Sequence, residues 1–145
     1  MESKEQNNQA LPIITLSCSY DIYAAHQLFR KEWPEAKNRE VFGHCADLHG
    51  HQYKLNVILK GAIDPDSGML LNGYAVDAII KEKIMAKIDH KFINDADDFF
   101  KTHLTTVEWI SYWAYQQLKD AFPANCQIDM IEVYETPGLV ARYKP

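Results

Sequence analysis

The chain has 145 residues, of which 47% are hydrophobic, and a formal net charge of −5 at pH 7. This length fits one domain with a single core of ordinary density. The acidic balance argues against binding to nucleic acid or to an anionic membrane, because both need clustered positive charge. A substrate that carries phosphate must therefore meet a local basic patch.

The first residues, Met1 to Ala10, are polar and do not resemble a signal peptide. We expect residues 1–12 to form a mobile tail and residues 13–145 to form one domain, with no apolar run of membrane-spanning length. An odd number of cysteines without paired spacing favours a reducing compartment, which predicts a cytoplasmic protein. These cysteines are Cys18, Cys45 and Cys126.

Two strands are predicted in the first half of the chain. Hydrophobic and polar residues alternate from Ile14 to Ile22, and again from about His51 to Gly61, as expected for half-buried strands. Between them, the charged stretch from Gln27 to His44 contains a Trp-Pro pair and is too long for a simple hairpin. It is therefore an excursion from the sheet.

The second half predicts two helices followed by two strands. Residues 75–87 are apolar at helical spacing, and residues 105–108 form a capping-box pattern that starts a second helix ending before Pro123. Residues 127–135 and 139–143 alternate as strands. The order ββααββ predicts an α+β fold, with a four-stranded antiparallel sheet and two helices on one face.

Three histidines are candidate metal ligands. His49 and His51 lie at i and i+2 of a strand, so their side chains share a face. His26 ends the first strand, and antiparallel pairing brings its ring to the other two. Three imidazoles with a fourth position open are typical of catalytic zinc. A chance His-X-His pair on a surface strand is the alternative, which His26 makes less attractive.

Four more residues are candidates for chemistry, each with a plain alternative. A thiol near a metal favours the thiolate, which makes Cys45 a candidate base, although a lone cysteine is commonly a small buried hydrophobe. Asp89 beside His90 fits a proton relay, in which the carboxylate orients or charges the imidazole. Glu135 ends a strand on its apolar face and points either into a cleft or into solvent.

These residues lie in motifs that resemble the 6-pyruvoyl-tetrahydropterin synthase and 6-carboxytetrahydropterin synthase family. The resemblance runs from about residue 17 to residue 143, and its motifs are Tyr23–His26, Cys45–Tyr53, Asp66–Met69, Ile88–Asn94, Thr105–Glu108 and Tyr134–Thr136. It implies the tunnelling fold, in which the sheets of several subunits join into a barrel, and commonly a homohexamer.

The resemblance also implies roles for the candidate residues. His26, His49 and His51 would bind zinc, Cys45 would be the catalytic base, and Asp89 with His90 would form the proton relay. The pterin would be anchored by Glu135, which can accept two parallel N–H bonds. Thr105 and Thr106 would be accessory pterin contacts, although helix capping is a sufficient reason for both.

Three places depart from the usual family pattern: Leu104, Trp109 and residues 72–74, where Asn-Gly-Tyr replaces an Asp-Phe pair. The last departure bears most on the placement of the substrate contacts, whereas the metal and relay residues keep the family pattern. Together with the departure at Trp109, it motivates one alternative, a non-catalytic homologue that binds pterin or zinc, which the presence of Cys45 disfavours. A generic zinc hydrolase is another alternative, and only Glu135 or Asp89 would supply its carboxylate base.

Two family reactions on 7,8-dihydroneopterin triphosphate remain open. The Cys-x-x-x-His-Gly-His spacing resembles the 6-carboxytetrahydropterin synthases of the queuosine pathway, which release acetaldehyde and triphosphate. Residues 41–43, Val-Phe-Gly, resemble the 6-pyruvoyl-tetrahydropterin synthases of the tetrahydrobiopterin pathway, where only triphosphate leaves. We give the spacing more weight and expect the carboxytetrahydropterin reaction.

Overall fold

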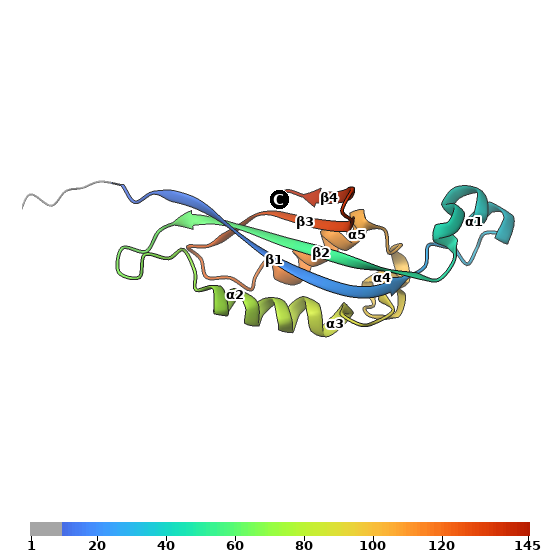
Figure 1. Cartoon of the computed structure of the whole chain (residues 1–145), viewed down its shortest axis with the longest axis horizontal. Helices are drawn as coiled ribbons and strands as arrows, with labels where there is room; N and C mark the ends of the chain where they lie inside the picture. The colour runs from blue at the N-terminus through green and yellow to red at the C-terminus, as the bar shows by residue number, and fades with distance from the viewer. Residues whose placement is uncertain (1–9) are drawn as a thin grey trace, which may run out of the picture.

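The computed structural model describes residues 10–145, so residues 1–9 of the expected tail lie outside it. Its centre is one antiparallel sheet in the order β1-β2-β3-β4 (Figure 1). The strands are β1 Ile13–His26, β2 His49–Ala62, β3 Gln127–Thr136 and β4 Leu139–Tyr143. All four predicted strands are confirmed, and the first two are longer than their alternation indicated. The domain boundary at residue 13 stays a prediction.

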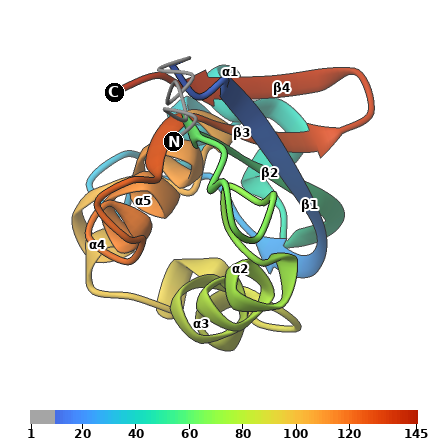
Figure 2. The ribbon, with the colours of Figure 1, turned by 90° about the vertical axis from the view of Figure 1, so that its left-hand side faces the viewer.

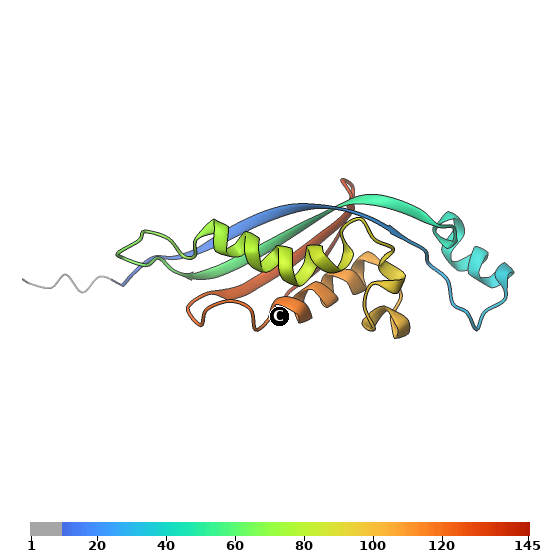
Figure 3. The same cartoon turned by 90° about the horizontal axis from the view of Figure 1, so that it is seen from below.

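The helices between β2 and β3 pack on one face of this sheet, as Figures 2 and 3 show. They are α2 Gly73–Ile80, α3 Ala86–Ile88, α4 Phe99–Thr102 and α5 Val107–Leu118, with a π-helical turn, Lys81–Met85, that joins α2 to α3. The predicted α+β arrangement is therefore confirmed. Within residues 10–145, no helix combines the length and apolar character needed to span a bilayer.

The departure at residues 72–74 has a local structural reason. Asn72 is the N-cap of α2, and its side-chain oxygen accepts the backbone N–H of Tyr74 at 2.9 Å. Asparagine is among the preferred N-cap residues, because its side chain satisfies a donor that the helix leaves free. These residues therefore start the helix.

The excursion between β1 and β2 folds into two helical segments that its sequence did not predict. They are α1 Glu35–Phe42 and the 3₁₀ turn η1 Gly43–Ala46. Figures 1 and 3 place α1 beyond the end of the sheet, away from the helices that cover it. We call residues 27–48 the arm.

The core lies between the sheet and the helices. Tyr53, Leu55, Val57 and Leu59 alternate along one face of β2 and are buried against helix residues such as Trp113. The same face of β2 begins with His49 and His51. The core therefore continues directly into the histidine cluster at the end of the sheet.

Candidate metal centre and its surroundings

The three histidines meet at the end of the sheet nearest the arm. Antiparallel pairing sets His26 opposite His49 and Ala24 opposite His51. The ring centroids lie 4.5 Å apart for His26 and His49, 5.1 Å for His26 and His51, and 4.9 Å for His49 and His51. One nitrogen from each ring lies within 4.8 Å of the others, so the structure brings the predicted ligands together.

Backbone carbonyls orient two of these rings. His26 Nδ1 lies 2.8 Å from the Thr105 carbonyl, and His49 Nδ1 lies 2.7 Å from the Asp47 carbonyl. A carbonyl only accepts, so each Nδ1 carries the proton and each Nε2 keeps its lone pair. Metal-binding histidines commonly have this arrangement, in which the second ring nitrogen donates to a carbonyl that fixes the orientation of the ring.

The Nε2 atoms of all three histidines are buried and have no hydrogen-bond partner within residues 10–145. Buried polar atoms are nearly always paired, and an unpaired one destabilises the fold. Three such atoms that converge on one point fit a metal ion, which would accept all three lone pairs. The residues present therefore fit the metal that their spacing predicted.

Burial disfavours the charged form of two of the three histidines. It lowers the pKa of His26 to about 4, an effect that the charges of His49 and His51 extend and the bond to Thr105 opposes. Burial also lowers the pKa of His51, followed by the effect of His49. Since a histidine binds metal only when its coordinating nitrogen is free of a proton, these shifts favour metal binding at neutral pH.

Glu135 adds a carboxylate to the cluster from β3. It shares the core face of that strand with Ile131 and Val133, and its Oε1 lies 3.6 Å from His51 Nε2. Its side chain is 13% exposed, and this burial raises its pKa, an effect that Glu108 strengthens and His49 opposes. Of the two directions that the sequence left open for Glu135, a cleft or solvent, the structure shows the first.

Cys45 approaches the cluster from the arm. It is half-buried in η1, and its carbonyl accepts the Leu28 N–H at 2.8 Å, just past the end of β1. Burial, with smaller effects of Glu135 and Cys45, raises the pKa of the Tyr53 hydroxyl. The Tyr53 ring in turn packs against His26 and His51. Cys45 and Glu135 therefore both contribute to the raised pKa of this buried tyrosine.

Asp89 and His90 lie on the outer edge of β1. Asp89 Oδ2 is 3.0 Å from His90 Nδ1, and Asp89 Oδ1 accepts the Tyr23 N–H at 3.0 Å. His90 has a positive φ of 58°, and its side chain is 75% exposed. His90 and His51 both line an open hollow of about 530 Å³ across β1 and β2. The His90 ring packs against Tyr23 at a centroid distance of 5.8 Å, and the part of the pair in the chemistry stays a prediction.

The two threonines have different surroundings. Thr106 is the N-cap of α5 and accepts the Trp109 N–H at 3.3 Å, so the capping position lies one residue later than a box starting at Thr105 requires. Thr105 is fully buried, and its hydroxyl lies 3.2 Å from Asn94 Oδ1. Its carbonyl orients His26, a role that sequence reasoning missed. The pterin contacts of both threonines stay predictions.

Comparisons with known proteins agree with this geometry. Residues 15–145 match the family described as 6-pyruvoyl tetrahydropterin synthase. The human 6-pyruvoyl tetrahydrobiopterin synthase is 31% identical over 83% of this chain and 84% of its own length. The 6-carboxy-5,6,7,8-tetrahydropterin synthase of Bacillus subtilis (strain 168) is 29% identical over 74% and 75%.

The fold agrees as well. The solved structure of the Caenorhabditis elegans 6-pyruvoyl tetrahydropterin synthase superposes with a TM-score of 0.85 and is 29% identical, over 93% of this chain and 97% of that one. The histidine cluster, the sheet and the matched sequence therefore lead to one conclusion. This chain belongs to the 6-pyruvoyl tetrahydropterin synthase family.

Proposed function

We propose that the chain is a zinc-dependent 6-pyruvoyl-tetrahydropterin synthase, which eliminates triphosphate from 7,8-dihydroneopterin triphosphate. The observation that carries the proposal is the set of three buried Nε2 atoms converging on one point, with Glu135 beside them. A site of three nitrogen ligands leaves a position open for substrate. Zinc held there would act as a Lewis acid toward the side-chain hydroxyls of the pterin.

The chain's own residues divide the remaining work. Glu135 accepts two parallel N–H bonds from the guanidine-like edge of the pterin, a geometry that gives recognition as well as charge. Cys45 removes a proton from the substrate side chain, and His90, held by Asp89, returns a proton at another carbon. Thr105 keeps the His26 imidazole aimed at the metal through its carbonyl.

The relatives favour the pyruvoyl reaction over the carboxytetrahydropterin reaction that the cysteine spacing favoured. Curated relatives named 6-pyruvoyl tetrahydrobiopterin synthase include the human protein, with broader coverage than the Bacillus subtilis 6-carboxy enzyme. The spacing Cys-x-x-x-His-Gly-His keeps the carboxytetrahydropterin reaction as the second candidate. Both reactions use the same metal and base, so the site geometry supports each.

Product analysis separates these reactions. Zinc-loaded protein is incubated with 7,8-dihydroneopterin triphosphate, and the products are identified by mass, with acetaldehyde measured separately. We expect triphosphate and a pyruvoyl pterin without acetaldehyde. Acetaldehyde with a carboxylated pterin would establish the second candidate instead. Binding of the pterin without turnover, equal in wild type and Cys45→Ala, would identify a non-catalytic homologue.

We also propose that the chain works in the cytoplasm as a homohexamer. Support for the assembly comes from β4 and from the part of β1 before Tyr23, which form the edges of the sheet in the described part of the chain and offer backbone groups for pairing. Mass measurement by light scattering tests it. A monomer at micromolar concentration would contradict it.

A further inference from the structure

The segment from Cys45 to His49 carries both the proposed base and one metal ligand. The turn η1 ends at Ala46, and Asp47 is extended, with φ −85° and ψ 150°. The Asp47 carbonyl lies 2.7 Å from His49 Nδ1. The direction of His49 Nε2 therefore depends on the orientation of one peptide plane, the one that follows Asp47.

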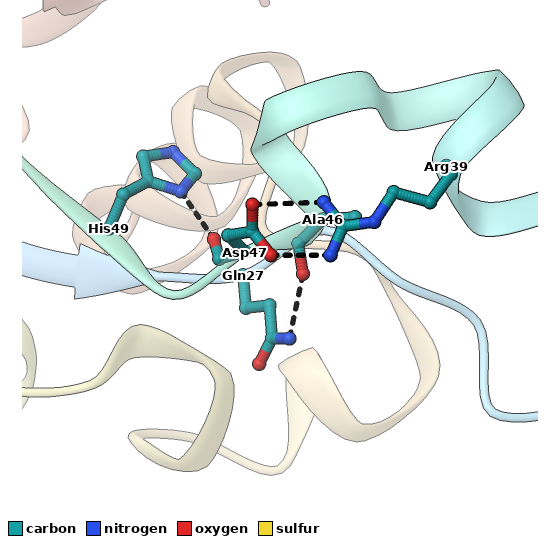
Figure 4. A network of polar contacts seen from close by, with 5 residues as sticks. All are labelled: Gln27, Arg39, Ala46, Asp47 and His49. Carbon is teal, nitrogen blue, oxygen red and sulfur yellow. Dashed lines mark hydrogen bonds and ion pairs between the residues drawn. The ribbon is translucent and has the colours of Figure 1, made fainter. Parts of the chain in front are cut away.

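Arg39 holds Asp47, the residue to which this carbonyl belongs. From the last turn of α1, its Nη1 donates to Asp47 Oδ2 at 2.9 Å and its Nη2 donates to Asp47 Oδ1 at 2.5 Å (Figure 4). Two parallel bonds between planar groups restrict rotation as well as distance. The carboxylate of Asp47 is thus held on one side while its carbonyl meets His49 on the other.

Gln27 holds the same segment from the opposite side. Its Nε2 donates to the Ala46 carbonyl at 2.7 Å, as Figure 4 shows. Gln27 is itself held by Asn94, whose Oδ1 accepts its N–H at 3.0 Å and whose Nδ2 donates to its carbonyl at 2.7 Å. The consecutive carbonyls of residues 46 and 47 therefore both accept a hydrogen bond from a side chain.

Gln27 is the first residue of the arm and is held at the end of β1, because it directly follows the ligand His26 and its partner Asn94 lies close to Thr105. The bond from Arg39 comes from α1, farther along the arm. Arg39 and Asp47 have side-chain exposures of 45% and 56%. Exposed ion pairs add little to folding stability, so the main consequence of this pair is geometric.

We propose that Arg39 is a positioning residue for the metal centre, acting through Asp47 to aim His49 Nε2 at the metal. The inference rests on the metal site of the proposed function. It makes α1 part of the site although no residue of α1 is a metal ligand. Loss of a partner that orients a ligand typically weakens metal binding by 10–100-fold.

The test is zinc affinity in the absence of pterin, measured by competition with a chromophoric chelator. We expect Arg39→Gln to weaken zinc binding about tenfold and Arg39→Lys, which keeps the charge but only one point of contact, to weaken it less. Arg30→Gln is the matched control. Arg30 is also on the arm, its side chain is 44% exposed, and its only ion pair is a long one of 3.9 Å to Glu32 in the described residues. The Arg30→Gln variant should therefore bind zinc with the affinity of wild type.

A double-mutant cycle tests the route through Asp47. If Arg39 acts through that carboxylate, Arg39→Gln with Asp47→Asn should bind zinc no more weakly than the weaker single variant. Additive losses would overturn this route. Circular dichroism and melting temperature, equal to wild type in Arg39→Gln, would show that the loss is local.

The outcomes separate this inference from the proposed function. Wild type that binds zinc and turns over, with Arg39→Gln equal to it in both, overturns the positioning role alone. Arg39→Gln with normal zinc affinity but a raised KM overturns it too, because that pattern identifies a substrate contact. Wild type that holds no zinc overturns the metal site and the inference together.

Discussion

In the metal-free protein, folding stability should depend on pH through His26. This side chain is fully buried in the structure, and its Nε2 has no hydrogen-bond partner among residues 10–145. Burial, the largest cause, lowers its pKa from 6.5 to about 4. In the unfolded chain the same imidazole returns to its ordinary pKa.

The direction and size of the effect follow from this difference. Between pH 6.5 and pH 4 the unfolded chain binds a proton at His26 that the folded chain does not, so the free energy of unfolding falls as the pH falls. Well above pH 6.5, His26 has no effect on the free energy of unfolding. At about 1.36 kcal/mol for each pH unit, the full loss is about 3 kcal/mol.

The assay is urea unfolding of chelator-treated protein from pH 7 to pH 4.5, for wild type and His26→Leu. Leucine fills a similar volume without a titrating group, so changes caused by carboxylates are common to both chains and cancel in the difference. We expect wild type to lose about 2 kcal/mol more than the variant over this range. If the free energy of unfolding fell equally with pH in the two chains, the buried and neutral state of His26 would be refuted.

Three further outcomes follow from the site and the core. Cys45→Ala should keep the fold and zinc content but lower turnover of the pterin triphosphate about a hundredfold or more, as loss of a general base does. Glu135→Gln should lower the affinity for a stable pterin by about 1.5–3 kcal/mol in direct titration, with Asp129→Asn as the unaffected control. Trp113→Ala, which empties a fully buried position, should lower the free energy of unfolding by about 3–5 kcal/mol in urea.

The sequence predicted the clustering of the three histidines well because strand geometry has a fixed period. Alternation places His49 and His51 on one face whatever surrounds them, and a β1–β2 pairing then sets only which residue of β1 stands opposite. The observed register puts His26 directly across from His49. Side-chain direction and strand order were therefore enough to predict the cluster.

The arm and the bonds that orient the ligands were not predictable in the same way. The helix α1 is a short one in a charged stretch, and its sequence lacks an apolar stripe. Gln27 and Asn94 act on backbone carbonyls that only the folded chain brings near them. The two threonines show most clearly what the sequence could not predict. The helix cap is Thr106, one residue later than the capping-box pattern indicates, and the carbonyl of Thr105 contacts His26 instead.

The position of the cluster explains how one face of β2 serves both stability and chemistry. Leu55, Val57 and Leu59 exclude water from the core, which at the end of the sheet includes the fully buried His26. Desolvation there disfavours the imidazolium, which leaves neutral ligands ready for a metal. A metal in turn would satisfy the three Nε2 atoms that the core leaves without partners among the described residues. Folding and metal binding are therefore coupled, and each should strengthen the other.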